Sequence, residues 1–300
     1  MAKTTLAPSA TAVRVFDEPK AALSMPIRKD SATDELIETL SKAVDSTIAA
    51  DNNANAPVTA TPNASVDAAA ANTPVVGHGT QVHDQVRIVP TSEYKAAAFA
   101  LAEAFADDDV SRYFVDTPDR AHWSAEQKWD LHLAIMEYMT YAHCLKGLVT
   151  TIGPDYDGVA LWMPPGNNVD DLLTVLRSGM WRLRYRLSAE GKKRFFDEFL
   201  PLLHDTKAAV LGARDAASWY LVYIGTRPGA RGKGYCRRLI EHITRVADAE
   251  RRATYLESSN ERNVQIYRRL GFAEEKRMYL QRERRVVALD VMVREPEVRE

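Results

Sequence analysis

The stretch of sequence that decides the fold runs from Trp219 to Glu257 and reads WYLVYIGTRPGARGKGYCRRLIEHITRVADAERRATYLE. Its first residues, Trp219 to Ile224, are apolar and aromatic, which predicts a strand. A basic, glycine-rich turn, Arg231 to Gly234, precedes a predicted helix over Tyr235 to about Glu250, and Thr254 to Glu257 predicts the next strand. A strand, a helix and a strand in this order predict two parallel strands joined by a right-handed crossover.

The turn between the first strand and the helix has the features of an anion site. Where a glycine-containing turn opens a helix, backbone N–H groups and the positive end of the helix dipole converge on one point. Gly232 and Gly234 let the main chain approach a phosphate closely, and Arg231 and Lys233 add positive charge. The pattern is not Gly-x-Gly-x-x-Gly and lacks the Gly-Lys-Ser/Thr of a P-loop, so by itself it indicates either an anion site or a structural turn.

The same segment resembles the acetyl-CoA signature of the GNAT acetyltransferases, Arg/Gln-x-x-Gly-x-Gly/Ala. Arg231 and Gly234 match this signature, and Cys236 stands where the family usually has Gly or Ala. The resemblance implies that acetyl-CoA is a co-substrate and that main-chain groups of Ile224, Gly225 and Thr226 pair with its pantetheine arm. It further implies that the pyrophosphate is held by the turn and the start of the helix, which are Arg231, Gly232, Lys233, Gly234, Tyr235 and Cys236.

A second block with the same resemblance lies downstream. It reads Tyr255-Leu256-Glu257-Ser258-Ser259-Asn260, followed by Tyr267 and Arg269-Leu270-Gly271-Phe272. In the family, an Asn seven residues before a Tyr reaches the pantetheine arm, and the Tyr donates a proton to the leaving thiolate. The resemblance places these roles on Asn260 and Tyr267. The residues of Trp219 to Leu221 and Tyr255 to Asn260 resemble those of the subgroup that includes puromycin N-acetyltransferase and many uncharacterised fungal proteins.

Two side chains are the expected catalytic residues. The phenol of Tyr267 is the expected general acid, since its reference pKa near 10 keeps it protonated at pH 7; the alternative is a core aromatic. Glu257 ends a strand beside the expected cleft and is the candidate general base. Its alternatives are a carboxylate paired with Arg231 or Arg262, or one that is simply solvated.

The acceptor side of the site is expected to come from outside these motifs. Tyr220 and Tyr223 are candidates, and strand alternation places them on opposite faces of the sheet, so that one of them packs in the core. Helical insertions at Ala121 to Cys144 and Val169 to Leu211 could roof a closed pocket. We therefore expect the acceptor to be the primary amine of a small molecule. A protein or peptide N-acetyltransferase, which needs an open groove, and a non-catalytic CoA-binding sensor are the alternatives.

The resemblance implies an α/β (α+β) GNAT fold, with a central mixed, mostly antiparallel sheet splayed around the acetyl-CoA site and flanked by helices. This domain is expected at residues 85–296. Residues 1–84 differ in composition, because Ser46 to Thr80 contains no Lys, Arg, Phe, Tyr or Trp, which predicts a disordered low-complexity leader. Further strands are expected at Val86 to Val89, Leu148 to Ile152, Gly158 to Met163, Phe272 to Leu280 and Val286 to Val293.

Composition excludes several classes of protein. The 39 basic and 41 acidic residues give a formal net charge of -2, so no global field recruits nucleic acid or an anionic membrane surface. No stretch approaches the ~18 apolar residues of a membrane span. Cys144 and Cys236 provide no disulfide framework, which favours a cytoplasmic location. His132 and His143 lie too far apart for a helical metal pair, so no metal is expected. The oligomeric state is left open.

Overall fold

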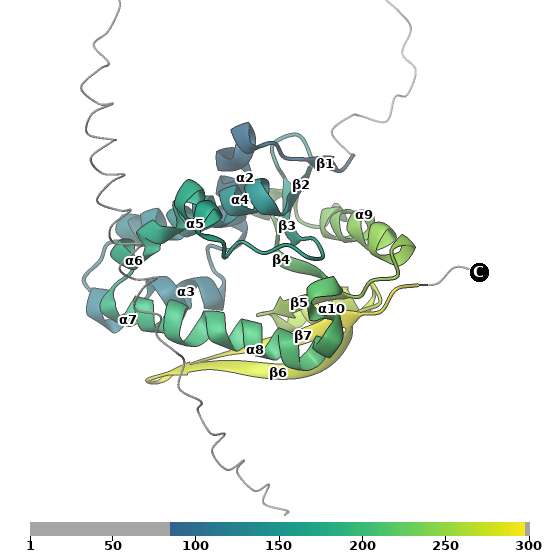
Figure 1. Ribbon diagram of the computed structural model, residues 1–300. Coiled ribbons are helices and arrows are strands. Elements are labelled where there is room, and N and C mark those ends of the chain that lie inside the picture. The colour runs from purple at the N-terminus through teal and green to yellow at the C-terminus, as the bar shows by residue number, and fades with distance from the viewer. Residues whose placement is uncertain (1–84, 298–300) are drawn as a thin grey trace, which may run out of the picture. The chain divides into compact units, whose positions relative to one another are not determined.

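The computed structural model describes residues 85–297, and the predicted leader at residues 1–84 lies outside the described residues. One sheet of seven strands, in the order β1-β2-β3-β4-β5-β7-β6, forms its centre (Figure 1). Only β4 and β5 pair in parallel, and every other neighbouring pair is antiparallel. The strands are β1 (Arg87–Ile88), β2 (Leu148–Ile152), β3 (Gly158–Met163), β4 (Trp219–Thr226), β5 (Thr254–Ser258), β6 (Ala273–Arg282) and β7 (Arg285–Arg294). The mixed, mostly antiparallel sheet that the sequence predicts is therefore confirmed.

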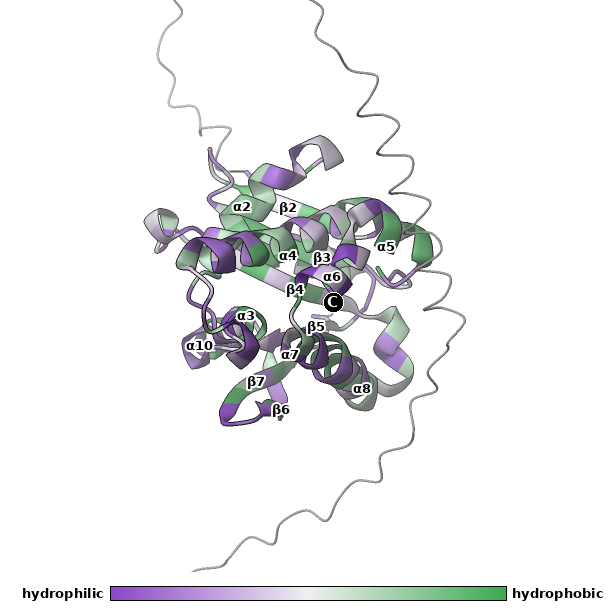
Figure 2. Cartoon of the chain, turned by 90° about the vertical axis from the view of Figure 1, so that its left-hand side faces the viewer, coloured by the Kyte–Doolittle hydropathy of each residue, from purple (hydrophilic) through white to green (hydrophobic). Residues whose placement is uncertain are grey.

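Helices flank both sides of this sheet. They are α2 (Tyr94–Ala104), α3 (Asp109–Val115), α4 (Ala125–Lys146), α5 (Leu172–Ser178), α6 (Leu183–Arg186), α7 (Ala189–Lys192), α8 (Leu200–Leu211), α9 (Tyr235–Ala249) and α10 (Glu261–Arg268). A π-helical segment, η5 (Lys193–Phe199), joins α7 to α8. In Figure 2, α2 and α5 are largely hydrophobic, whereas α10 is largely hydrophilic. No helix in residues 85–297 is long and apolar enough to cross a membrane.

Three apolar clusters hold the helices against the sheet. One lies between α9 and strands β2 to β5, and includes Leu239, Ile240 and Trp162. A second lies on the opposite face of β2 to β4, under α2 and α4. The third packs α3, the η5 segment and α8 against β5, β6 and β7. Because burial of apolar area drives this packing, each half of the sheet acquires its own cover of helices.

One helix was not expected from the sequence. Asp108 is the middle residue of an acidic run, Asp107 to Asp109, and its Oδ1 accepts from the backbone N–H groups of Val110 and Ser111, each at 3.0 Å, and caps α3. Aspartate at this position satisfies N–H groups that have no partner within the helix. α3 buries Tyr113 and Phe114 against the third cluster, and its capping residue is thereby fixed near the sheet.

Candidate active site

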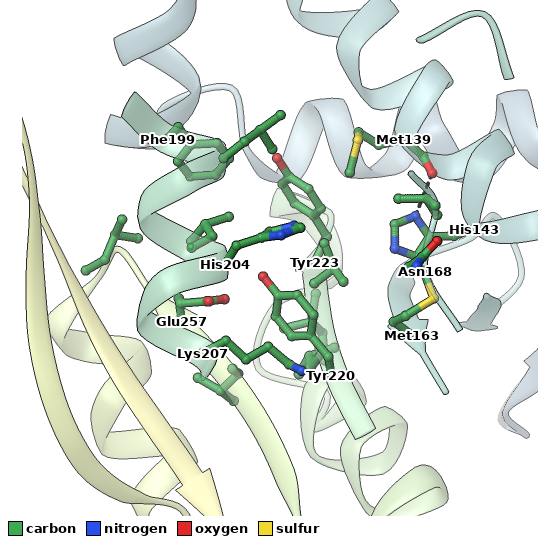
Figure 3. Close-up of a pocket in the computed structure, with 18 of the residues that line it drawn as sticks. Met139, His143, Met163, Asn168, Phe199, His204, Lys207, Tyr220, Tyr223 and Glu257 are labelled. Carbon is green, nitrogen blue, oxygen red and sulfur yellow. Dashed lines mark hydrogen bonds between the residues drawn. The ribbon is translucent and has the colours of Figure 1, made fainter. Parts of the chain in front are cut away.

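The two parallel strands separate soon after they meet. β4 and β5 pair only from Trp219, opposite Thr254, to Leu221, opposite Leu256. β4 then runs on to Thr226 along β3, while β5 continues along β7. A cavity of about 450 Å³ opens at this separation, and residues from both strands line it. Its other walls come from α4, α8 and residues 163–170 (Figure 3).

Tyr220 and Tyr223 both face this cavity, and the expectation that they lie on opposite faces of the sheet is wrong. The reason is a β-bulge. Leu161 of β3 pairs with Tyr223 and Trp162 pairs with Leu221, so one extra residue of β4 lies between these two pairs. An extra residue shifts the alternation of side chains by one position. Residues three apart in the sequence are therefore brought to the same face.

Glu257 lies on β5 where the two strands part, and its half-buried side chain lies in the cavity wall with the Oε1 atom buried. Its Oε1 atom has no hydrogen-bond partner among the described residues. Burial raises the pKa of this carboxyl group to about 7, although the hydroxyls of Tyr220 and Tyr255 and the charge of Lys207 act to lower it. Burial likewise raises the pKa of Tyr220, with a further contribution from Glu257, so this phenol stays protonated at neutral pH. A carboxyl group of this kind can both accept and release a proton near pH 7.

Lys207 is a cavity residue that no sequence motif indicates. It reaches the cavity from α8, and its Nζ lies 5.7 Å from the ring centroid of Tyr220 and 5.9 Å from that of Tyr255. The same Nζ donates to the carbonyl oxygen of Asp215 at 3.0 Å and forms an ion pair with its carboxylate. Lys207 thus places a positive charge near Glu257 and is itself neutralised on its other side by Asp215.

Tyr267 lies on α10 and also lines the cavity. Its ring packs against Phe272 with centroids 6.1 Å apart, and 5% of the residue is exposed. Burial raises the pKa of its phenol, and the nearby Cys236 and Asp108 add to this shift. The hydroxyl therefore keeps its proton at neutral pH, as the expected role of a general acid requires.

The basic turn has an open approach from solvent. Gly232 and Gly234 have φ of 86° and 78°, a region that favours glycine, and no atom lies within 4 Å of a Cβ built on either residue. Gly234 precedes α9 and provides no side-chain cap for the start of this helix. Arg231 donates to the carbonyl oxygens of Thr226 and Ala104, each at 3.4 Å, and is exposed.

The remaining turn residues differ in their exposure. Lys233 is half-exposed and its Nζ lies 3.6 Å from Oδ2 of Asp157. Tyr235 is buried, and Cys236 packs beside the cluster under α9. Burial raises the pKa of the Cys236 thiol to about 11, so it is neutral at pH 7 and not a ready nucleophile.

Beyond Leu221, the edge of β4 on the side of β5 is no longer paired with β5. Ile224, Gly225 and Thr226 pair with β3 on one side, and β5 has already diverged on the other. Gly225 faces α2, since a Cβ there would lie 2.6 Å from Cβ of Ala104. An unpaired strand edge, an uncapped helix start and open glycines fit an extended arm that ends in a pyrophosphate. These residues therefore fit acetyl-CoA.

The structure also shows the positions of three other residues considered in the sequence analysis, Asn260 and the two histidines on α4. Asn260 is exposed, and its Oδ1 caps α10 by accepting from the backbone N–H of Arg262 at 2.9 Å. His132 and His143 are both buried, and Nε2 of His132 lies 2.9 Å from the carbonyl oxygen of Ala102. Within residues 85–297, no three His, Cys, Asp or Glu side chains are grouped to hold a metal ion.

Comparisons of the sequence with known proteins identify its relatives. The sequence profile described as the Acetyltransferase (GNAT) family matches residues 192–272. An uncharacterized N-acetyltransferase of Schizosaccharomyces pombe is 49% identical over 210 residues, which are 70% of this chain and 82% of that protein.

Solved structures with similarity to the chain include two insect proteins. Arylalkylamine N-acetyltransferase 2 from Aedes aegypti is 15% identical, with a TM-score of 0.47, over 71% of this chain and 99% of the other. A Drosophila melanogaster polyamine N-acetyltransferase, described as forming N-acetylagmatine, is 14% identical, with a TM-score of 0.45. The match covers 70% of this chain and 99% of that chain. The 49% identity to the yeast protein and the match of the family profile to the motif-bearing segment decide the assignment: the chain belongs to the GNAT family of acetyltransferases.

Proposed function

We propose that this acetyltransferase transfers an acetyl group from acetyl-CoA to the primary amine of a small molecule, by direct attack of the amine in a ternary complex. The observation that carries the proposal is Glu257, a buried carboxyl group with one oxygen unpaired, at the point where β4 and β5 separate. The surrounding cavity has walls on the side away from the strands, formed by α4, α8 and residues 163–170. A bounded cavity of this size suits a small molecule better than a peptide, which needs an open groove.

The charges around the cavity favour a cationic acceptor. Four carboxyl groups line it, those of Asp108, Asp170, Asp215 and Glu257, against one ammonium group, that of Lys207. Because fields are focused in a low-dielectric cleft, an excess of negative charge attracts an alkylammonium ion. Glu257 then accepts a proton from this ion at its free Oε1, which leaves a neutral, nucleophilic amine.

Tyr267 is proposed to supply the proton that the leaving sulfur of CoA takes up. When bound, acetyl-CoA supplies the acetyl group as a reactive thioester. The buried phenol of Tyr267 remains protonated at neutral pH and is proposed to protonate the leaving sulfur. Its ring packs against that of Phe272, which restricts the positions that the hydroxyl can take.

The test is incubation of the full chain with labelled acetyl-CoA and two sets of acceptors, small primary amines and peptides with a free N-terminus or a lysine. We expect acetylated products from the amine set, detected by mass spectrometry. Products from the peptide set alone would replace the proposal by a protein N-acetyltransferase. Tight CoA binding without any product would favour a CoA-binding sensor.

A further inference from the structure

His143 is a cavity residue to which the proposed chemistry gives no role. It lies on α4, in the part of the cavity wall that also contains Met139 and Met163, away from Glu257 and Lys207 (Figure 3). Only 1% of the residue is exposed. A histidine in such a wall either supports the fold or contacts whatever fills the cavity.

Hydrogen bonding fixes which nitrogen of His143 carries the proton. Nδ1 lies 2.7 Å from the carbonyl oxygen of Met139, one turn earlier on α4. A carbonyl oxygen can only accept, so Nδ1 must be the donor, and Nε2 of the neutral ring then carries a lone pair. Burial lowers the pKa of the ring to about 4, so the ring is neutral at physiological pH.

The lone pair of Nε2 has no partner in the described part of the chain. Nε2 is buried, and no donor lies within hydrogen-bond distance of it. Asn168 is drawn beside it in Figure 3, but its Nδ2 does not donate a hydrogen bond to Nε2. Leaving a buried acceptor without a donor costs free energy, which an occupant of the cavity would recover by donating to it.

The cavity therefore contains two buried acceptor atoms without partners, Oε1 of Glu257 and Nε2 of His143. The cavity wall also contains apolar and aromatic side chains, among them Met139, Tyr223 and Phe199. A ligand that suits both atoms has a hydrogen-bond donor at each end and an apolar body between them. The donor at Glu257 is the amine. A neutral donor at His143 avoids burying a charge against an imidazole that is itself uncharged.

We infer that the acceptor is an amine that carries a second, neutral donor, a hydroxyl or an amide N–H, which binds Nε2 of His143. This inference rests on the proposed function and narrows its substrate class. His143 acts here as a specificity-determining residue, because it discriminates between acceptors and takes no part in proton transfer.

The experiment compares pairs of amines that differ by one group. The first set pairs α,ω-amino alcohols of stepwise increasing length with alkylamines in which methyl replaces the hydroxyl, and the second pairs tyramine with 4-methylphenethylamine. For the best-fitting pair, the wild-type chain should prefer the hydroxyl compound by about tenfold in kcat/KM, which corresponds to about 1.4 kcal/mol. His143→Leu should remove or reverse this preference, and His143→Gln, which retains an acceptor atom, should restore part of it.

His132→Leu is the matched control, since His132 lies on the same helix, is also buried, and bonds to a backbone carbonyl outside this cavity. It should leave the hydroxyl preference unchanged.

A wild-type preference within twofold of unity for every pair overturns the inference, while the proposed function stands. Equal losses for both members of a pair in His143→Leu also overturn it, because they indicate a purely structural role. If His143→Leu does not fold, the wild-type preference and His143→Gln decide the matter. Acetylation of peptides only, or of no amine, overturns both the proposed function and the inference.

Discussion

Replacing Glu257 by Gln removes a buried carboxyl group while nearly preserving its shape. Burial raises the pKa of Glu257 from a reference value of 4.5 to about 7. The native state then holds the proton more tightly than the unfolded chain, so its contribution to stability is greatest below pH 4.5 and declines as the pH rises through 7. Each pKa unit corresponds to about 1.4 kcal/mol, so the ionised group destabilises the fold by about 3 kcal/mol at pH 8.

Glu257→Gln should therefore be more stable than the wild type at pH 8, by up to about 3 kcal/mol relative to their difference near pH 4.5. Urea unfolding of both full chains, followed by tryptophan fluorescence from pH 4.5 to 8, measures this change. The control is Glu274→Gln, which removes the same charge from a partly exposed ion pair with Arg268 and should shift little with pH. Parallel stability curves for the wild type and Glu257→Gln would show that burial does not perturb this carboxyl group.

The same variant should lose activity by about a hundredfold or more, as expected for removal of a general base. For an acceptor amine of pKa about 10, log kcat/KM of the wild type should rise with pH and level off above about 7, once Glu257 is ionised. In Glu257→Gln, the rise should continue toward the pKa of the amine itself. A wild-type profile that also rises without a plateau would refute Glu257 as the base.

Three further substitutions test the rest of the site. Tyr267→Phe should lower kcat with little change in CoA affinity measured by calorimetry; an unaltered rate across pH would remove its acid role. Arg231→Glu should weaken CoA binding about tenfold or more, because it places a negative charge beside the expected pyrophosphate, and unaltered affinity would take Arg231 out of the site. Gly225→Ala should destabilise the fold by about 1–3 kcal/mol in thermal unfolding, because its Cβ would lie 2.6 Å from that of Ala104. Gly229→Ala, with open space around it, is the control, and an equal melting temperature for both variants would contradict this packing.

Much of the sheet was predictable because its strands are short apolar runs bounded by turn residues. β2 and β3 begin and end where the sequence predicts, on either side of the turn-rich segment 153–157. α10 begins at Glu261, directly after Asn260, because Asn260 caps it. α3 was missed, although an aspartate before an apolar run is a capping signal; the helix has only seven residues and starts inside the acidic run Asp107 to Asp109.

The site was predictable only where its residues belong to a contiguous motif. Glu257 and Tyr267 were found from their places in the downstream block, and both line the cavity. Lys207 and His143 come from separate helices, and nothing in their local sequence distinguishes them from other helical residues. The common face of Tyr220 and Tyr223 depends on pairing with β3, which alternation along β4 alone cannot indicate.

The position of β7 has a consequence for how the protein can be divided. The segment from Trp219 to Phe272 carries both motifs, yet within it β5 has only its three-residue pairing with β4. The other edge of β5 is completed by β7, through five residue pairs from Thr254 opposite Arg294 to Ser258 opposite Asp290. The segment that carries the motif residues is therefore shorter than the segment that must fold together. A fragment ending after Phe272 would keep every motif residue but expose the edge of β5 that β7 pairs with, and we expect it to aggregate instead of binding CoA.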